Sequence, residues 1–165
     1  STLHQATLSC LYDRRRFIEN LILNGIQLQS LMSCVFSIIG PHLDVDRLVS
    51  EHRLRPYKRF YKGEPVFKTK PESAKREYSG LSIKASEAGF NEFDQQVKDT
   101  LKFLRRNRKK LKDISLNKTV KYMNLNFGVD HKGSFCQSHY LPENLVKLAG
   151  ELRISFEVSI YQKGE

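Results

Sequence analysis

A long, one-sided amphipathic helix is the sequence feature that most restricts how this chain can fold. From Asn91 to Lys112 the sequence reads NEFDQQVKDTLKFLRRNRKKLK. Apolar residues recur there at helical spacing, at Phe93, Val97, Leu101 and Leu104. The opposite side is expected to carry five cations: Lys98, Lys102, Arg105, Arg106 and Lys109. Because such a helix buries only one stripe, it has to pack against another layer of structure.

The same helix carries much of the positive charge of the chain. Lysines and arginines number 28 against 18 acidic residues, for a formal net charge of +10. This excess favours an acidic partner, either a nucleic acid, an anionic membrane surface or an acidic protein face. The alternative is a solvated outer face whose charge serves solubility.

Length and cysteine content point to one reduced, cytoplasmic domain. A chain of 165 residues can bury a full core in a single domain. Cys10, Cys34 and Cys136 are odd in number and irregular in spacing, so we expect free thiols. Polar residues interrupt the apolar run near the N-terminus, so neither a signal peptide nor a membrane span is expected.

The first 31 residues differ in pattern from the rest. Asp13 could cap a helix that runs from Arg14 to about Asn24 and ends at Gly25. The predicted organisation is therefore an N-terminal helical extension over 1–31, followed by a single α+β domain over 32–165.

Within that domain, apolar periodicity predicts five strands and three helices. The order is β-α-β-β-α-β-α-β, which favours a mainly antiparallel sheet with helices packed on one face. The predicted strands are Ser33–Ile39, Tyr57–Tyr61, Leu81–Ala85, Lys121–Val129 and Ile154–Ile160, and the helices are Asp44–Arg53, Asn91–Lys112 and Pro142–Leu152. Residues 43–64 and 141–165 echo each other, which indicates either two related β-α-β halves or chance similarity.

Asp44 and Asp46 resemble a carboxylate pair for metal binding or acid–base chemistry. We instead interpret Asp44 as the N-cap of the first domain helix, with Leu43 and Leu48 forming a hydrophobic staple. Asp46 then places a negative charge near the positive end of that helix.

His131, Cys136 and His139 lie close together, next to Asp130, and offer the nitrogen and sulfur donors that zinc prefers. No paired CxxC accompanies them, and no fourth ligand is apparent. A Cys136–His139 nucleophile pair similarly has no orienting third group. We therefore assign no catalytic residue, no metal site and no cofactor.

The stretch from Arg53 to Lys62 interleaves aromatic residues with cations, notably Tyr57, Arg59 and Tyr61. Single-stranded nucleic acids are bound by such mixtures, because bases stack on rings while cations meet phosphates. An edge strand protected by lysines would give the same pattern.

Several blocks of the chain resemble a bacterial family of domains of unknown function, over about Ser33 to Tyr161. The matching blocks are FSIIGPHLDVD from Phe36, LRP from Leu54, GEP from Gly63, LNFGV from Leu125, YLPENL from Tyr140, LAGEL from Leu148 and SIY from Ser159. Some members resemble immunity proteins of polymorphic or contact-dependent toxin systems. No catalytic residues follow from the resemblance. Arg153 stands where relatives tend to have glycine, which puts the helix-to-strand turn there in doubt.

These features together predict a non-enzymatic cytoplasmic binding protein, and the family resemblance suggests an immunity protein that neutralises a cognate bacterial toxin by direct contact. The expected partner is the acidic surface of a cognate toxin. The residues predicted to contact it are Lys98, Lys102, Arg105, Arg106, Lys109, Tyr57, Arg59 and Tyr61. The alternative is a basic module that binds RNA or single-stranded DNA through the same residues.

Overall fold

The computed structural model describes residues 34–66, 71–133 and 135–162, and these form five strands and three helices. The elements in chain order are β1 (Cys34–Gly40), α2 (Val45–His52), β2 (Lys58–Phe60), β3 (Ser79–Ser86), α3 (Phe93–Ser115), β4 (Tyr122–Asp130), α4 (Glu143–Glu151) and β5 (Ile154–Tyr161). The predicted α+β class and element order are confirmed, with boundaries that differ by a few residues. The helix predicted over 14–24 lies outside the described residues.

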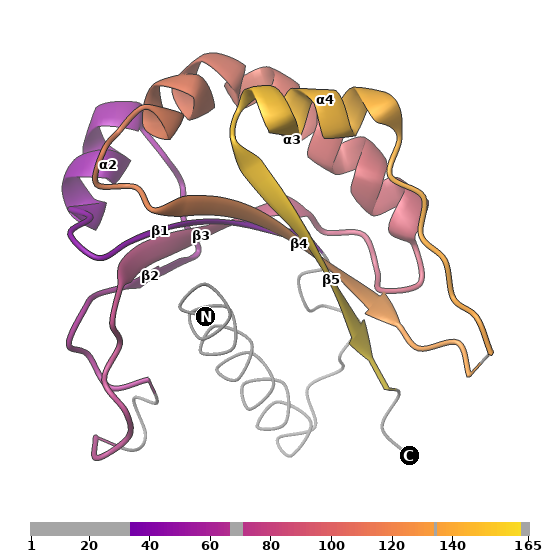
Figure 1. Cartoon of the computed structure of the whole chain (residues 1–165), viewed down its shortest axis with the longest axis horizontal. Helices are drawn as coiled ribbons and strands as arrows, with labels where there is room; N and C mark the ends of the chain where they lie inside the picture. The colour runs from indigo at the N-terminus through magenta and orange to yellow at the C-terminus, as the bar shows by residue number, and fades with distance from the viewer. Residues whose placement is uncertain (1–33, 67–70, 134, 163–165) are drawn as a thin grey trace.

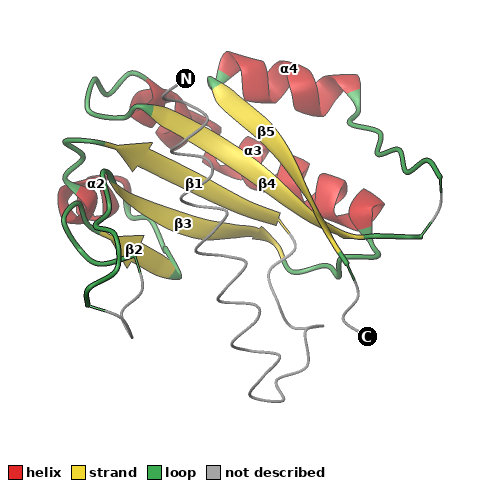
Figure 2. Ribbon diagram, turned by 60° about the horizontal axis from the view of Figure 1, so that its bottom comes forward, coloured by secondary structure: helices red, strands yellow, loops and turns green. Residues whose placement is uncertain are grey.

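The five strands form one mostly antiparallel sheet in the order β2-β3-β1-β4-β5. β1 pairs antiparallel with both β3 and β4, and β2 pairs antiparallel with β3. β4 pairs parallel with β5, and α4 supplies the crossover connection that a parallel pair needs. Figures 1 and 2 show α2, α3 and α4 together on one face of this sheet.

The core lies between those helices and the facing side of the sheet. Alternate residues of the central strands point into it, among them Phe36, Ile38, Leu125 and Phe127, each of which is fully buried. The predicted stripe of α3 supplies the other side. Phe93, Val97 and Leu104 are buried, Leu101 is partly buried, and the helix continues to bury Leu111 and Ile114.

Serine and asparagine side chains occupy the alternate positions on the other face of the sheet. The hydroxyls of Ser37 and Ser82 lie 3.1 Å apart across β1 and β3. The Asn126 amide donates to the Ser159 hydroxyl at 2.9 Å between β4 and β5. β4 and β5 alternate in this way, as the sequence predicts, whereas β1 is buried along its whole length and also carries Val35 and Ile39 on this face.

The apolar residues of β5 alternate as predicted, but the last two are not buried. Val158 is 38% exposed and Ile160 is 53% exposed. β5 is an edge strand, and its C-terminal end runs past the helices that cover the sheet (Figure 1).

The two β-α-β units suggested by the sequence echo differ in topology. β1 and β2 run parallel to each other but lie on either side of β3, whereas β4 and β5 are direct neighbours. The helices of both units end in the same way, because Arg53 after α2 and Arg153 after α4 have left-handed backbones, with φ of 49° and 58°.

The left-handed arginines explain how both helices stop. The amide of Arg53 donates to the carbonyl of Ser50, and the amide of Leu54 donates to Val49, which is the Schellman arrangement. Glycine usually holds the left-handed position of this motif. The turn whose geometry was in doubt at Arg153 therefore keeps a glycine-like conformation with an arginine in it.

Candidate functional site

The cations of α3 fall into three groups that face different neighbours. Lys98, Lys102, Arg105 and Lys109 are exposed and lie on one side of the helix, as predicted. We call these four residues the outer stripe. Within residues 34–66, 71–133 and 135–162, none of the four side chains has an ion pair or hydrogen bond.

A second pair of cations ties α3 to the end of α4. Arg108 Nη2 lies 2.8 Å from Glu151 Oε2, and Lys112 Nζ donates to the Glu151 carbonyl at 3.0 Å. Both contacts place positive charge at the C-terminus of α4, where the helix dipole is negative. Arg108 and Lys112 therefore contact α4, whereas the four residues of the outer stripe contact no other described element through a hydrogen bond or ion pair.

Arg106 belongs to a third group, contrary to its predicted place beside the outer stripe. It turns toward the α2–β2 connection and lines a cavity of about 440 Å³. Three further cations line the same cavity, namely Arg53, Arg55 and Lys110. We call this space the cationic cavity. The sequence shows that the stretch from Arg53 is basic. That its arginines lie beside Arg106 and Lys110 of α3 is a result of tertiary packing.

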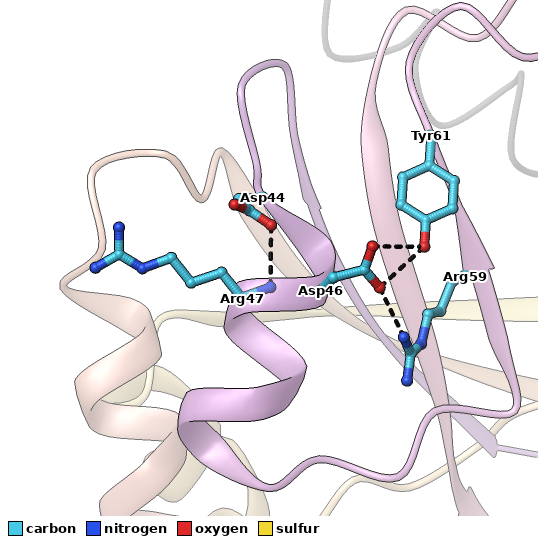
Figure 3. Close-up of polar contacts among 5 residues, drawn as sticks. All are labelled: Asp44, Asp46, Arg47, Arg59 and Tyr61. Carbon is cyan, nitrogen blue, oxygen red and sulfur yellow. Dashed lines mark hydrogen bonds and ion pairs between the residues drawn. The ribbon is translucent and has the colours of Figure 1, made fainter.

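The candidate residues Arg59 and Tyr61 are held by the first turn of α2. Arg59 Nη1 lies 2.7 Å from Asp46 Oδ1, and the Tyr61 hydroxyl donates to the Asp46 carboxylate at 3.0 and 3.1 Å (Figure 3). Desolvation, followed by the hydrogen bond and the charge of Asp46, raises the pKa of the Tyr61 phenol above its usual value. Asp46 therefore fastens the edge strand β2 to α2.

Asp44 caps α2 as predicted, because its Oδ1 accepts a hydrogen bond from the backbone amide of Arg47 at 3.0 Å (Figure 3). Leu43 and Leu48 are both buried in the core, as a hydrophobic staple requires. The two aspartates are thus engaged in separate structural contacts.

Tyr57 and Tyr61 differ in accessibility. Tyr57 is 39% exposed, and its backbone amide donates to the carbonyl of Ser82. Tyr61 packs partly against the core. Tyr57 is thus the more exposed of the two tyrosines, and the binding role predicted for these residues stays a prediction.

The histidines of the loop after β4 are used in local contacts. His131 Nδ1 accepts from the Gly133 amide at 3.2 Å, and the His139 ring lies 4.5 Å from the ring of Phe93. Gln137 Nε2 is 2.9 Å from His139 Nε2. In the described part of the chain, no three histidine, cysteine or acidic residues gather as a metal site would need.

Fold and surface define this molecule as an α+β domain with one helix-covered sheet, a basic outer helix and a cationic cavity. A family model described as a domain of unknown function, DUF4279, matches residues 30–163, and the chain belongs to that family. All eight described elements fall within the matched range. No curated protein and no solved structure matched the chain. Among the described helices, none has the length and apolar character needed to cross a membrane.

Proposed function

We propose that this protein is a non-enzymatic binding protein whose outer stripe docks on an acidic surface of a partner protein. The observation that carries the proposal is the set of four exposed cations on one side of α3, none of them neutralised by a described residue. From Lys98 to Lys109 the stripe extends over about 16 Å at the helical rise.

The rigidity of α3 supports this role. Its opposite side is anchored in the core through Val97, Leu104 and Leu111, so the four charges are presented on a fixed backbone. Such a presentation increases the association rate with a complementary surface and fixes the orientation of the complex.

The family resemblance suggests what the partner is. Relatives that resemble immunity proteins favour a cognate bacterial toxin, met in the cytoplasm and neutralised by occlusion of its active surface. A basic stripe of this kind requires an acidic patch on that toxin.

Nucleic acid is the second candidate partner, because α3 carries eight lysines and arginines against three aspartates. Phosphates would meet the outer stripe in place of carboxylates. Arg59 and Tyr61, which are predicted contacts for either partner, are already engaged with Asp46. The nucleic-acid alternative therefore depends, like the protein one, mainly on the outer stripe.

The test is co-expression with the product of the adjacent gene, followed by measurement of complex formation, relief of toxicity and association rate. A variant with Lys98, Lys102, Arg105 and Lys109 changed to glutamate should associate at least about tenfold more slowly. A matched control changes four exposed lysines outside α3 to glutamate: Lys62, Lys118, Lys132 and Lys147. The control has the same net charge as the variant.

Equal rates for the two variants would show that net charge, not the outer stripe, governs association. Absence of any complex, with toxicity unrelieved, would remove the immunity role. Steeply salt-dependent binding to single-stranded RNA or duplex DNA, lost in the stripe variant, would select the nucleic-acid alternative.

A further inference from the structure

We propose that the cationic cavity binds a small organic phosphate, with the phosphate held by the cations at its rim and an apolar or aromatic body resting on its floor. The cavity lies between the α2–β2 connection, β3 and α3, to one side of the outer stripe. Its volume of about 440 Å³ falls within the range of small-molecule sites. This site is separate from the surface proposed above to bind a protein.

The floor of the cavity is apolar and rigid. Leu54, Ile83, Phe103 and Leu111 line it. Leu111 is 1% exposed, and the Phe103 ring packs against the ring of Phe36 with centroids 5.6 Å apart. A surface of this kind is preformed, so a flat apolar group could cover it without reorganisation of the core.

The rim is cationic without an acidic residue in the lining. Arg53 and Arg55 approach from the α2–β2 connection, while Arg106 and Lys110 approach from α3. Three arginines outside the cavity are paired, Arg47 with Glu51, Arg59 with Asp46 and Arg108 with Glu151, whereas in the described part of the chain Arg105 on the outer stripe is not. The rim side chains have no such partner within the described residues.

Four cations around one cavity repel one another, and an anion among them relieves that repulsion. Arginine forks bind two oxygens of a phosphate at once, and a phosphate monoester carries close to two negative charges at neutral pH. A monoester therefore suits this rim better than a carboxylate does. The apolar floor adds a preference for a phosphate that bears an organic group over inorganic phosphate.

Phenyl phosphate is the probe that combines both features. We would titrate it into the full-length protein, labelled with nitrogen-15, at an ionic strength of about 0.15 M, where exposed charges further than roughly 8 Å apart are screened. Saturable shifts are expected at the amides of Ile83, Phe103, Asn107 and Leu111. The dissociation constant for phenyl phosphate should be at least about tenfold lower than those for inorganic phosphate and for benzoate.

Adjacent arginines of α3 provide a matched pair of variants. Arg106→Glu should raise the dissociation constant for phenyl phosphate about tenfold or more, because a rim contact becomes repulsive. Arg105→Glu makes the same charge change one residue earlier, on the outer stripe, and should alter that constant by less than about twofold.

Arg53→Gly separates loss of binding from loss of folding. Its φ of 49° suits glycine, so this variant removes a rim guanidinium at a position where glycine relieves backbone strain. It should bind phenyl phosphate more weakly while its melting temperature stays the same or rises.

Three outcomes would overturn the proposal: no saturable shift, equal affinity for inorganic and phenyl phosphate, or equal weakening by Arg105→Glu and Arg106→Glu. Each is independent of the proposed protein partner. Arg53→Gly leaves the outer stripe intact and should not change complex formation, so the two proposals can fail separately.

Discussion

Two arginines hold backbone conformations that normally belong to glycine. Arg53 and Arg153 end α2 and α4 with positive φ, where the Cβ of an L-residue crowds its own backbone. Both side chains are exposed. The arginine side chain of Arg53 lines the cationic cavity, which gives a reason for an arginine at this position. For Arg153 the described residues offer no side-chain hydrogen bond or ion pair that would compensate for the strain.

Replacing Arg153 by glycine should therefore stabilise the protein. We expect Arg153→Gly to raise the free energy of unfolding by about 1 kcal/mol, measured by urea denaturation. Arg153→Lys keeps the charge and the left-handed strain, and should leave stability unchanged. A loss of stability in the glycine variant would mean that the arginine side chain, rather than the turn, stabilises this end of α4.

A difference of one residue also decides which cations share a surface. Successive residues of a helix point about 100° apart, so Arg105 lies on the outer stripe while Arg106 faces the cationic cavity. The sequence grouped the two together because both lie away from the apolar stripe. The α2–β2 connection lies beside Arg106 and not beside Arg105, and the sequence alone does not give that position.

Among the elements, the edge strand β2 is held by unusually close packing on β3. Phe60 pairs with Gly80, and its ring occupies the space where a side chain at that position would stand. A Cβ added at Gly80 would lie 2.5 Å from the Phe60 ring and 2.6 Å from the carbonyl oxygen of Ile38. The Asp46 contacts with Arg59 and Tyr61 fasten the same strand from the helix side.

Gly80→Ala should accordingly loosen β2. We expect it to lower the free energy of unfolding by about 1–3 kcal/mol, because the backbone at Ile38 cannot move aside cheaply. Gly150→Ala is the control, since nothing lies within 4 Å of its added Cβ and alanine favours the helix. Thermal melts of both variants compare the two sites, and unchanged stability in Gly80→Ala would show that Phe60 adjusts freely.

Across the whole molecule, one core joins the three described helices to the sheet. Leu104 of α3 is fully buried and belongs to the same cluster as buried residues of the central strands. Because the residues of α2, α3 and α4 belong to the same cluster, the described domain should unfold as one unit.

Leu104→Ala tests that expectation. It should cost about 2–5 kcal/mol, and circular dichroism in the far and near ultraviolet should shift to the same lower melting temperature. Leu116→Ala is the matched control, since Leu116 follows the same helix but is 59% exposed. Separate transitions in the two spectral regions would mean that helices and sheet unfold independently.

Local sequence patterns were enough to predict the number, type and order of the described elements, the N-cap at Asp44, and the buried stripe of α3. These features depend on periodicity and on contacts between near neighbours, so a short window of residues carries them.

Long-range packing sets the strand order, the parallel placement of β5 beside β4, the contacts of Arg59 and Tyr61 with Asp46, and the cavity lined by both Arg53 and Arg106. Each of these features brings together residues that are distant in the chain. Whether such residues contact one another depends on how the helices pack on the sheet. That packing is set by the shape of the whole core and not by any local sequence pattern.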